Sequence, residues 1–197
     1  MPSTISNHIS TELKSVAQQL RRNTVKVRIN NDSAGSGVIW NSDGVIVTNA
    51  HVATSKRAVV ELYDGRVVEA VRTKIDPNVD LAVLEIKTDN LDAATVGNIN
   101  SLRVGELVLA VGNPFGDTGV VTVGMISRLQ KYTNKSTQKT YLSILADITL
   151  HPGNSGGLLA DCCSRVIGIN TMIVYGAAVA IPVSTVENFL NPAVEVI

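Results

Sequence analysis

Cysteine is nearly absent from this 197-residue chain, which contains only Cys162 and Cys163. Neighbouring cysteines can pair only by closing a strained ring, and neither has another partner in the chain. The disulfide framework of small secreted proteins is therefore excluded. Two thiols also fall short of the ligand set of a zinc site, so we expect no metal.

Net charge and long apolar runs are missing as well. Seventeen basic and seventeen acidic residues cancel, which removes the electrostatic case for nucleic acid as a partner. No apolar run approaches the roughly 20 residues of a membrane helix. The first twenty residues lack the basic start and apolar core of a secretory signal. We therefore expect a cytoplasmic protein without a membrane segment, or a periplasmic or anchored one if a leader has been trimmed.

Helix is predicted only near the two ends of the chain. Apolar residues at helical spacing predict a helix over residues 4–22, with Ser10 or Thr11 as a candidate cap. A second, short helix is predicted at Thr185–Leu190, because Asn191-Pro192 stops it there.

Short apolar segments separated by turns fill the space between these helices. From Thr24 onward, apolar and polar residues alternate as in a half-buried strand. About a dozen strands favour an all-β fold of two packed six-stranded antiparallel β-barrels, with an N-terminal helix and a short C-terminal helix. The later strands are predicted at Gly37–Trp40, Gly44–Thr48, Ala58–Leu62, Val67–Ile75, Leu81–Ile86, Leu107–Val111, Val120–Ser127, Leu142–Asp147, Gly157–Ala160, Val166–Thr171 and Ala177–Ile181.

The chain divides into three segments on this reading. An N-terminal helical segment covers residues 1–23, and one β domain covers 24–190. The two barrels of that domain join near residues 88–105, and residues 191–197 form a C-terminal tail.

One serine stands in a glycine-rich turn, Gly153-Asn154-Ser155-Gly156-Gly157. Glycines allow such a turn to expose a hydroxyl and to aim backbone N–H groups at one point, as an oxyanion hole requires. Glycine-rich turns also serve as plain hairpin tips. The turn alone leaves both interpretations open.

A serine nucleophile needs a base, and the chain offers His8, His51 and His151. His51 follows the apolar strand at 44–50, which would hold its ring rigidly. His8 lies in a polar segment, and no apolar element fixes His151. A core histidine with satisfied hydrogen bonds explains His51 equally well on this segment alone.

The base in turn needs a carboxylate to hold its tautomer. Asp80 directly precedes the strongly apolar segment Leu81–Ile86, where an unpaired charge would cost free energy because it is removed from water. The nearest competitor, Asp76, belongs to the turn Asp76-Pro77-Asn78, and turn aspartates mostly bond their own backbone.

These residues lie in three segments in the order His, Asp, Ser, and the chain from about residue 24 to 190 resembles the protease domain of HtrA/Deg-type serine proteases, without a PDZ domain. Those trypsin-like enzymes have the chymotrypsin-like double β-barrel. The segments that carry the resemblance are Thr48–Val52, Asp80–Leu84 and Gly153–Gly157, supported by Gly35–Ile39, Leu102–Gly105, Val111–Gly116, Val166–Thr171 and Ala180–Pro182.

The resemblance implies a serine endopeptidase that hydrolyses unfolded or extended polypeptides through an acyl-enzyme, without metal or cofactor. It assigns His51 as general base, Asp80 as its carboxylate and Ser155 as nucleophile, with the N–H groups of Gly153 and Ser155 as the oxyanion hole. It also implies self-association, as a trimer through the N-terminal segment. The rival interpretation is a catalytically silent protease-fold module that binds peptides or a partner protein.

Substrate preference is predicted from the same resemblance. Thr149 stands six residues before the nucleophile, at the base of the specificity pocket, where no carboxylate would attract Lys or Arg. Asn170 and Thr171, followed by Met172 and Ile173, resemble the strand edge to which substrate pairs. We expect a preference for small or medium aliphatic residues before the cut.

Three positions bear on activation and on a competing function. Asn154 replaces the aspartate that a pancreatic-type zymogen needs, so amine-triggered activation is not expected. His151 stands where the family commonly has asparagine. A phosphate-binding interpretation of Gly35-Ser36-Gly37 is set aside, because no helix and no lysine follow it.

Overall fold

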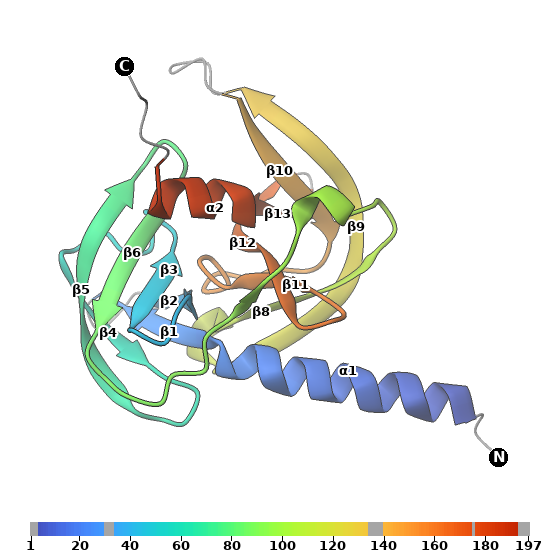
Figure 1. Ribbon diagram of the computed structural model, residues 1–197, viewed down its shortest axis with the longest axis horizontal. Helices are drawn as coiled ribbons and strands as arrows, with labels where there is room; N and C mark the ends of the chain where they lie inside the picture. Colours follow the sequence, from blue (N-terminus) through green and yellow to red (C-terminus); the bar gives the residue numbers. More distant parts are fainter. Residues whose placement is uncertain (1–3, 30–33, 134–139, 175, 193–197) are drawn as a thin grey trace.

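The computed structural model describes residues 4–29, 34–133, 140–174 and 176–192. Two β-barrels lie next to each other, a long helix runs out from them, and a short helix lies over their junction (Figure 1). The elements are α1 (Thr4–Arg22), β1 (Thr24–Arg28), β2 (Ala34–Ile39), β3 (Val45–Thr48), β4 (Arg57–Glu61), β5 (Val67–Asp76), β6 (Leu81–Ile86), β7 (Thr95–Val96), η1 (Ile99–Ser101), β8 (Leu107–Gly112), η2 (Pro114–Gly116), β9 (Val120–Thr133), β10 (Thr140–Asp147), β11 (Leu158–Asp161), β12 (Arg165–Val174), β13 (Ala177–Pro182) and α2 (Val183–Leu190).

The first barrel closes in the strand order β1-β2-β3-β6-β5-β4, with β4 returning to β1. All of its pairings are antiparallel. Alternation of apolar and polar residues along β1 and β4 places one face inside, where Val25, Val27 and Val60 are fully buried.

The second barrel has the order β11-β8-β9-β10-β13-β12 and closes where β11 pairs with β12. A two-residue strand, β7, pairs in parallel with Arg165 and Val166 of β12. The prediction of two six-stranded antiparallel barrels with two helices is therefore confirmed. The sequence did not predict β7, because two residues carry no periodicity.

A third apolar cluster lies between the barrels and takes in both helices. Val16 and Leu20 of α1 pack there with Val38 of the first barrel and Leu158 of the second. Val186 of α2 belongs to the same cluster and is fully buried. Each such side chain contributes about 1.5–3 kcal/mol through burial, so the cluster fixes the barrels against each other.

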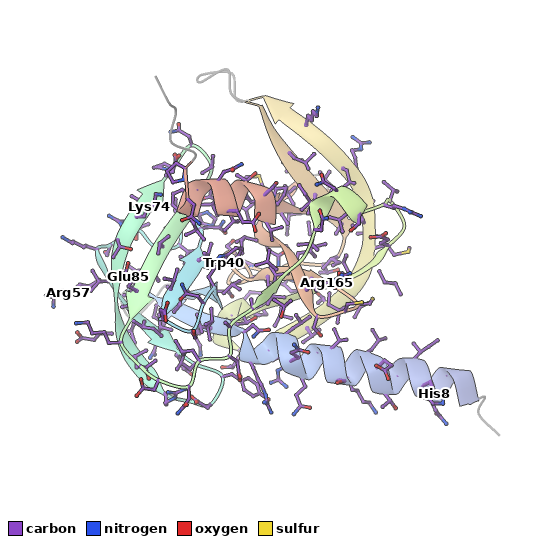
Figure 2. The ribbon with its side chains drawn as sticks, in the orientation of Figure 1. His8, Trp40, Arg57, Lys74, Glu85 and Arg165 are labelled. Atoms are coloured by element: carbon purple, nitrogen blue, oxygen red, sulfur yellow. The ribbon has the colours of Figure 1, made fainter. Side chains whose placement is uncertain are left out.

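Helix α1 begins and ends where the sequence predicts, but its proposed cap is wrong. Thr11 lies inside the helix, and its hydroxyl donates to the carbonyl oxygen of Asn7 at 2.8 Å. The outer part of the helix extends beyond the barrels, with His8 near its free end (Figures 1 and 2). Within the described ranges, no helix is both long enough and apolar enough to cross a membrane.

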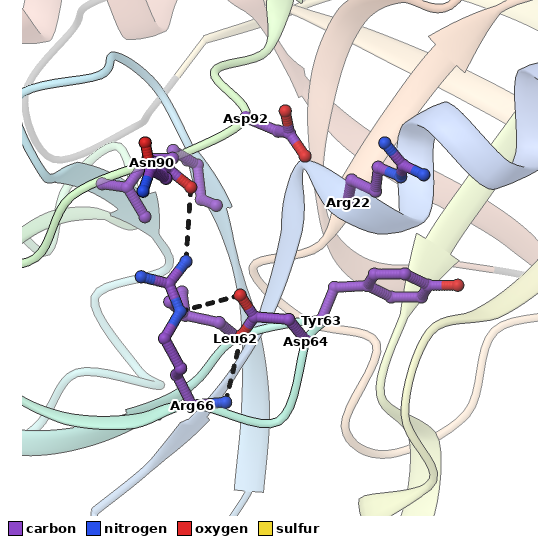
Figure 3. Close-up of a pocket in the computed structure, with 9 residues that line it drawn as sticks. Arg22, Leu62, Tyr63, Asp64, Arg66, Asn90 and Asp92 are labelled. Atoms are coloured by element: carbon purple, nitrogen blue, oxygen red, sulfur yellow. Dashed lines mark hydrogen bonds and ion pairs between the residues drawn. The ribbon is translucent and has the colours of Figure 1, made fainter.

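The chain that leaves the first barrel after β6 is held by one arginine. The Arg66 guanidinium donates to Thr88 Oγ1 at 3.0 Å and to the carbonyl oxygens of Asp89 and Asn90. Its Nε also binds the Asp64 carboxylate at 2.7 Å (Figure 3). A pocket of about 290 Å³ opens there, but these polar groups already bind one another. We interpret the arrangement as a clamp on the start of the inter-barrel connection.

Lys74 links β5 to the C-terminus of α2. Its Nζ donates to the carbonyl oxygen of Phe189, lies 3.4 Å from that of Leu190, and stands 4.9 Å from the Phe189 ring centroid. Figure 2 shows Lys74 at the end of the short helix. A cation at a helix C-terminus and over an aromatic ring is stabilising on both counts.

We expect Lys74→Met to lower the free energy of unfolding by about 1–2 kcal/mol, because both interactions are lost while the aliphatic stem stays. Urea titration of the variant against the wild type measures this difference. Lys87→Met removes an exposed lysine of the same barrel and serves as the control. Equal stability of the two variants would show that Lys74 contributes nothing beyond its stem.

Candidate active site

The three predicted triad residues come from both barrels. His51 follows β3 and Asp80 precedes β6, and these two strands are paired antiparallel in the first barrel. Ser155 precedes β11 in the second barrel, in the loop that leads from β10. The candidate nucleophile therefore belongs to one barrel, and the candidate base and its carboxylate belong to the other.

His51 and Asp80 form a close pair. His51 Nδ1 lies 3.0 Å and 2.9 Å from the two carboxylate oxygens, and the His51 backbone N–H donates to Oδ1 at 3.1 Å. The histidine side chain is 50% exposed and the aspartate side chain 24% exposed. This arrangement places the ring proton on Nδ1 and leaves Nε2 as the free base.

Two further residues fix the Asp80 carboxylate and backbone. Thr171 Oγ1 donates to Asp80 Oδ2 at 2.5 Å, and Asn49 Nδ2 donates to the Asp80 carbonyl oxygen at 3.0 Å. Asp80 has φ = 56°, the left-handed region that aspartate tolerates better than most residues. The register of β12 on β13 shifts between Asn170 and Met172, so Thr171 is the extra residue of a bulge. Bulges re-aim side chains in this way.

The pKa values of the pair follow from these contacts. The hydrogen bond with Asp80 raises the pKa of His51 above its ordinary value, against the opposing effect of burial. Burial works to raise the pKa of Asp80, but hydrogen bonds from His51 and Thr171 outweigh it and leave that pKa lowered. Asp80 is therefore ionised at neutral pH and able to stabilise an imidazolium.

Ser155 lies on two consecutive tight turns. The Asn154 N–H donates to the His151 carbonyl oxygen at 3.0 Å, and the Gly157 N–H donates to the Asn154 carbonyl oxygen at 3.0 Å. Gly153 has φ = 101° and Gly156 has φ = 83°, each in the third position of its turn. Positive φ at that position is characteristic of type II turns, which also favour the proline found at position 152.

The orientation of the peptide before Gly153 is set by a neighbouring loop. The Phe115 N–H donates to the Pro152 carbonyl oxygen at 3.0 Å. Because a trans peptide places C=O and N–H on opposite sides, the Gly153 N–H points away from Phe115. Among the described residues, the N–H groups of Gly153 and Ser155 have no acceptor. Both donors are thus free for a substrate oxygen.

Among the described residues, no hydrogen bond joins the Ser155 hydroxyl to His51. Its Oγ donates instead to the Thr171 carbonyl oxygen at 3.1 Å. The nucleophile candidate is therefore turned toward β12, while the base and its carboxylate are already paired. A connected triad requires the hydroxyl to leave the Thr171 carbonyl oxygen and turn to His51.

The family model described as "Trypsin-like peptidase domain" matches residues 35–169. The crystal structure of Deg5 superposes with a TM-score of 0.80 at 32% identity, over 90% of this chain and 91% of that one. The chain belongs to the HtrA/Deg family of trypsin-like serine proteases.

Other family members agree in fold and sequence. The HtrA-type protease AlgW with tripeptide superposes with a TM-score of 0.81 at 34% identity, over 90% of this chain and 63% of that one. "Putative serine protease HhoB" of Synechocystis sp. is 40% identical over 160 residues, 78% of this chain and 38% of its own length. The chain thus spans between 29% and 40% of the length of such curated relatives.

The predicted substrate-binding residues of this HtrA-type domain separate into exposed and buried groups. Thr149 is exposed, and Met172 and Ile173 are 52% and 51% exposed. Asn170 is fully buried, and its side chain donates to the Leu158 carbonyl oxygen at 2.7 Å. Thr171 is also buried, so the exposed side chains among these β12 residues are those of Met172 and Ile173.

An apolar pocket of about 680 Å³ opens beside Asp80 and Thr171. Its wall combines β12 with strands β10 and β13 of the second barrel. The apolar residues that line it include Met172, Val174, Leu142, Leu145, Val179 and Ile181.

The other triad candidates lie in different surroundings. Asp76 Oδ1 accepts from the Asn78 backbone N–H at 2.9 Å, as a turn aspartate does. His8 is exposed on α1, and the His151 ring packs on Phe115 with centroids 5.4 Å apart. No sequence pattern connects Asn49 or the Thr171 hydroxyl with Asp80. Their only signal is polarity at buried positions between apolar residues.

Proposed function

We propose that this chain is a serine endopeptidase that hydrolyses unfolded or extended polypeptides through an acyl-enzyme. The observation that carries the proposal is the His51–Asp80 pair, bonded through Nδ1 and supported by Thr171, beside a serine on preset turns. Family membership gives the reaction class. The chemistry of this chain's own residues follows from the contacts.

In the proposed reaction Ser155 turns from the Thr171 carbonyl oxygen to His51 Nε2 and gives up its proton as it attacks the peptide carbonyl. Asp80 stabilises the imidazolium, which then donates the proton to the leaving amine. The free N–H groups of Gly153 and Ser155 bind the developing oxyanion. Water repeats the sequence on the acyl-enzyme.

An extended substrate pairs with β12 by strand addition in this proposal. The pairing of β11 with β12 ends at Ile169, which leaves the edge beyond Asn170 open. Met172 and Ile173 on that edge, and a threonine rather than a carboxylate at position 149, favour aliphatic side chains before the cut. Specificity for Lys or Arg is not expected.

Cleavage-site profiling in a denatured protein mixture tests activity and preference together. We expect cuts after Val, Ala, Ile or Leu with the wild type and none with Ser155→Ala. Cuts mainly after basic residues would contradict the predicted pocket.

The resting position of Ser155 favours one rival, a silent module that binds peptides or a partner protein. A hydroxyl that stays bonded to the Thr171 carbonyl oxygen is not activated by His51. A fluorophosphonate probe separates the two functions. Labelling that depends on Ser155 supports the enzyme, and absence of labelling at any pH supports the module.

The activity should depend on pH through His51. We expect kcat/KM to fall as the pH is lowered through the His51 pKa, because a protonated imidazole cannot accept the serine proton. The Asp80 hydrogen bond raises that pKa, so the midpoint lies above about 6.5. The stability that the raised His51 pKa contributes has the opposite dependence: it is present below the ordinary histidine pKa while Asp80 remains ionised, and it is lost as the pH rises through the folded pKa. A pH–rate profile with a midpoint below 6.5 would contradict the pairing.

We also propose that α1 mediates self-association, in line with the trimer that the family resemblance implies. Ile9 is 55% exposed and continues, through Leu13, the apolar stripe whose inner residues Val16 and Leu20 are buried. Light scattering of the wild type and Ile9→Lys tests this. A monomeric mass for both would overturn it.

A further inference from the structure

Ser36 is a fully buried serine in β2 that touches the loop of the candidate nucleophile from the other barrel. Its Oγ donates to the Gly153 carbonyl oxygen at 2.7 Å. Ser36 belongs to the segment Gly35-Ser36-Gly37, which the sequence does not support as a phosphate-binding site. The contact is the only side-chain bond to the Gly153 carbonyl among the described residues.

The direction of the Ser36 hydroxyl is fixed by Asn113. The Asn113 backbone N–H and its Nδ2 both donate to Ser36 Oγ, at 2.8 Å and 3.1 Å. A hydroxyl has two acceptor lone pairs and one proton, so these donors leave the proton for Gly153. Asn113 cannot turn away, because Nδ2 also donates to the Val25 carbonyl oxygen and Oδ1 accepts from the Gly119 N–H.

Ser36 holds the loop at two places. Besides the bond from its hydroxyl to Gly153, its backbone N–H donates to the Ser155 carbonyl oxygen at 2.8 Å. These are the two residues whose own N–H groups are free. The Pro152–Gly153 peptide, in contrast, has the Phe115 N–H as its one hydrogen-bond partner among the described residues.

Gly153 packs closely against Asn113, the residue that also orients the Ser36 hydroxyl. A Cβ placed on it would lie 2.4 Å from the Asn113 carbonyl oxygen, so the loop packs directly on this backbone. The Gly153 carbonyl belongs to the Gly153–Asn154 peptide, which links the two peptides that carry the Gly153 and Ser155 N–H groups. Without Ser36, only the bond from the Asn154 N–H to the His151 carbonyl oxygen would hold this linking peptide among the described residues, and the N–H groups on either side would be less firmly oriented. A carbonyl aimed at the substrate oxygen would repel the developing charge.

We propose that Ser36 is a positioning residue, which orients the N–H groups of Gly153 and Ser155 toward the substrate oxyanion. It acts through the loop and does not itself contact the substrate. The inference rests on the proposed peptidase activity. The amide signals of the free protein test it separately.

The test compares Ser36→Ala with Thr24→Val in the full chain. Thr24→Val is the matched control, because it removes another buried hydroxyl, bonded to the Leu20 carbonyl oxygen at 3.0 Å, on the neighbouring strand. For Ser36→Ala we expect kcat to fall roughly ten- to a hundredfold with KM changed by less than about threefold, since transition-state binding is lost. The His51 midpoint in the pH–rate profile stays where it is in the wild type.

Amide NMR on the same samples gives a readout that does not need turnover. We expect the Gly153 and Ser155 signals to shift or broaden in Ser36→Ala and to stay unchanged in Thr24→Val. Unchanged signals and a kcat within about twofold of the wild type would overturn the inference. Equal losses in both variants would also overturn it, because they indicate a general loss of stability. A wild type that hydrolyses nothing would refute the proposed function and leave the NMR comparison to decide the role of Ser36.

Ser36→Cys provides a second variant if the alanine variant does not fold. Its thiol is a weak donor of nearly the same shape, so the same pattern in smaller degree is expected. Wild-type kcat and wild-type amide signals in this variant would overturn the inference.

Discussion

Ser155→Ala should lower kcat/KM by about 10⁶-fold, because the atom that forms the acyl-enzyme is removed. The residual rate would come from substrate binding and from the oxyanion-binding N–H groups, which are backbone atoms and remain. The fold should be unaffected, since the Ser155 hydroxyl makes a single bond, to the Thr171 carbonyl oxygen. Hydrolysis of an aliphatic peptide ester, followed under single-turnover conditions, measures the loss.

Ser127→Ala is the matched control for this experiment. Ser127 is exposed on β9 of the same barrel, and its hydroxyl also donates to a carbonyl oxygen, that of Leu145 at 3.1 Å. Its removal should leave the rate within about twofold of the wild type. Activity that survives in Ser155→Ala would assign the hydrolysis to a contaminant or to another nucleophile, and the proposed mechanism would fail.

Much of the fold could be predicted because each strand carries its own signal. Alternating residues such as Val25 and Val27, and turn residues such as Asp64-Gly65, mark the strands of the first barrel. Local sequence patterns do not show which strands pair with one another when they are far apart in the chain. The sequence predicts that this strand ends near Ser127, but β9 continues to Thr133 because β10 pairs with residues 125–133 of it.

The candidate site was predictable as a list of residues and not as a set of contacts. His51 and Asp80 stand at strand ends that sequence periodicity locates, and the structure brings them together because β3 pairs with β6. The Thr171 hydroxyl binds Asp80 from a one-residue bulge in β12. No residue type in this segment predicts that bulge. The resting bond from Ser155 to the Thr171 carbonyl oxygen is equally invisible in the sequence.

The supporting contacts of Asp80 lead to the second large expected effect. Asp80→Asn should lower kcat by about 10⁴-fold while the fold is kept. Asparagine has the same shape and accepts the left-handed φ of 56° at this position. One carboxylate oxygen becomes an NH₂ group, which donates where Oδ1 or Oδ2 now accepts. If that group faces His51 Nδ1, the ring proton moves to Nε2, and the ring can no longer take a proton from Ser155.

Thr171 decides which way the new amide turns. Its hydroxyl donates to Asp80 Oδ2, and the His51 backbone N–H donates to Oδ1, so both positions of the carboxylate receive donors. An NH₂ group at either position therefore faces a donor, and only the threonine hydroxyl can rotate to accept. We expect the amide nitrogen on the Thr171 side, where it also lies closest to His51 Nδ1.

Asp76→Asn is the control, because Asp76 was the competing carboxylate and asparagine preserves its turn. Its kcat should match the wild type, and the difference between the two variants measures what a carboxylate at position 80 contributes. Comparable losses in both would mean that the turn before β6, and not the charge on Asp80, sets the activity. An Asp80→Asn variant that keeps the wild-type kcat would remove the carboxylate from the mechanism and leave His51 to act alone.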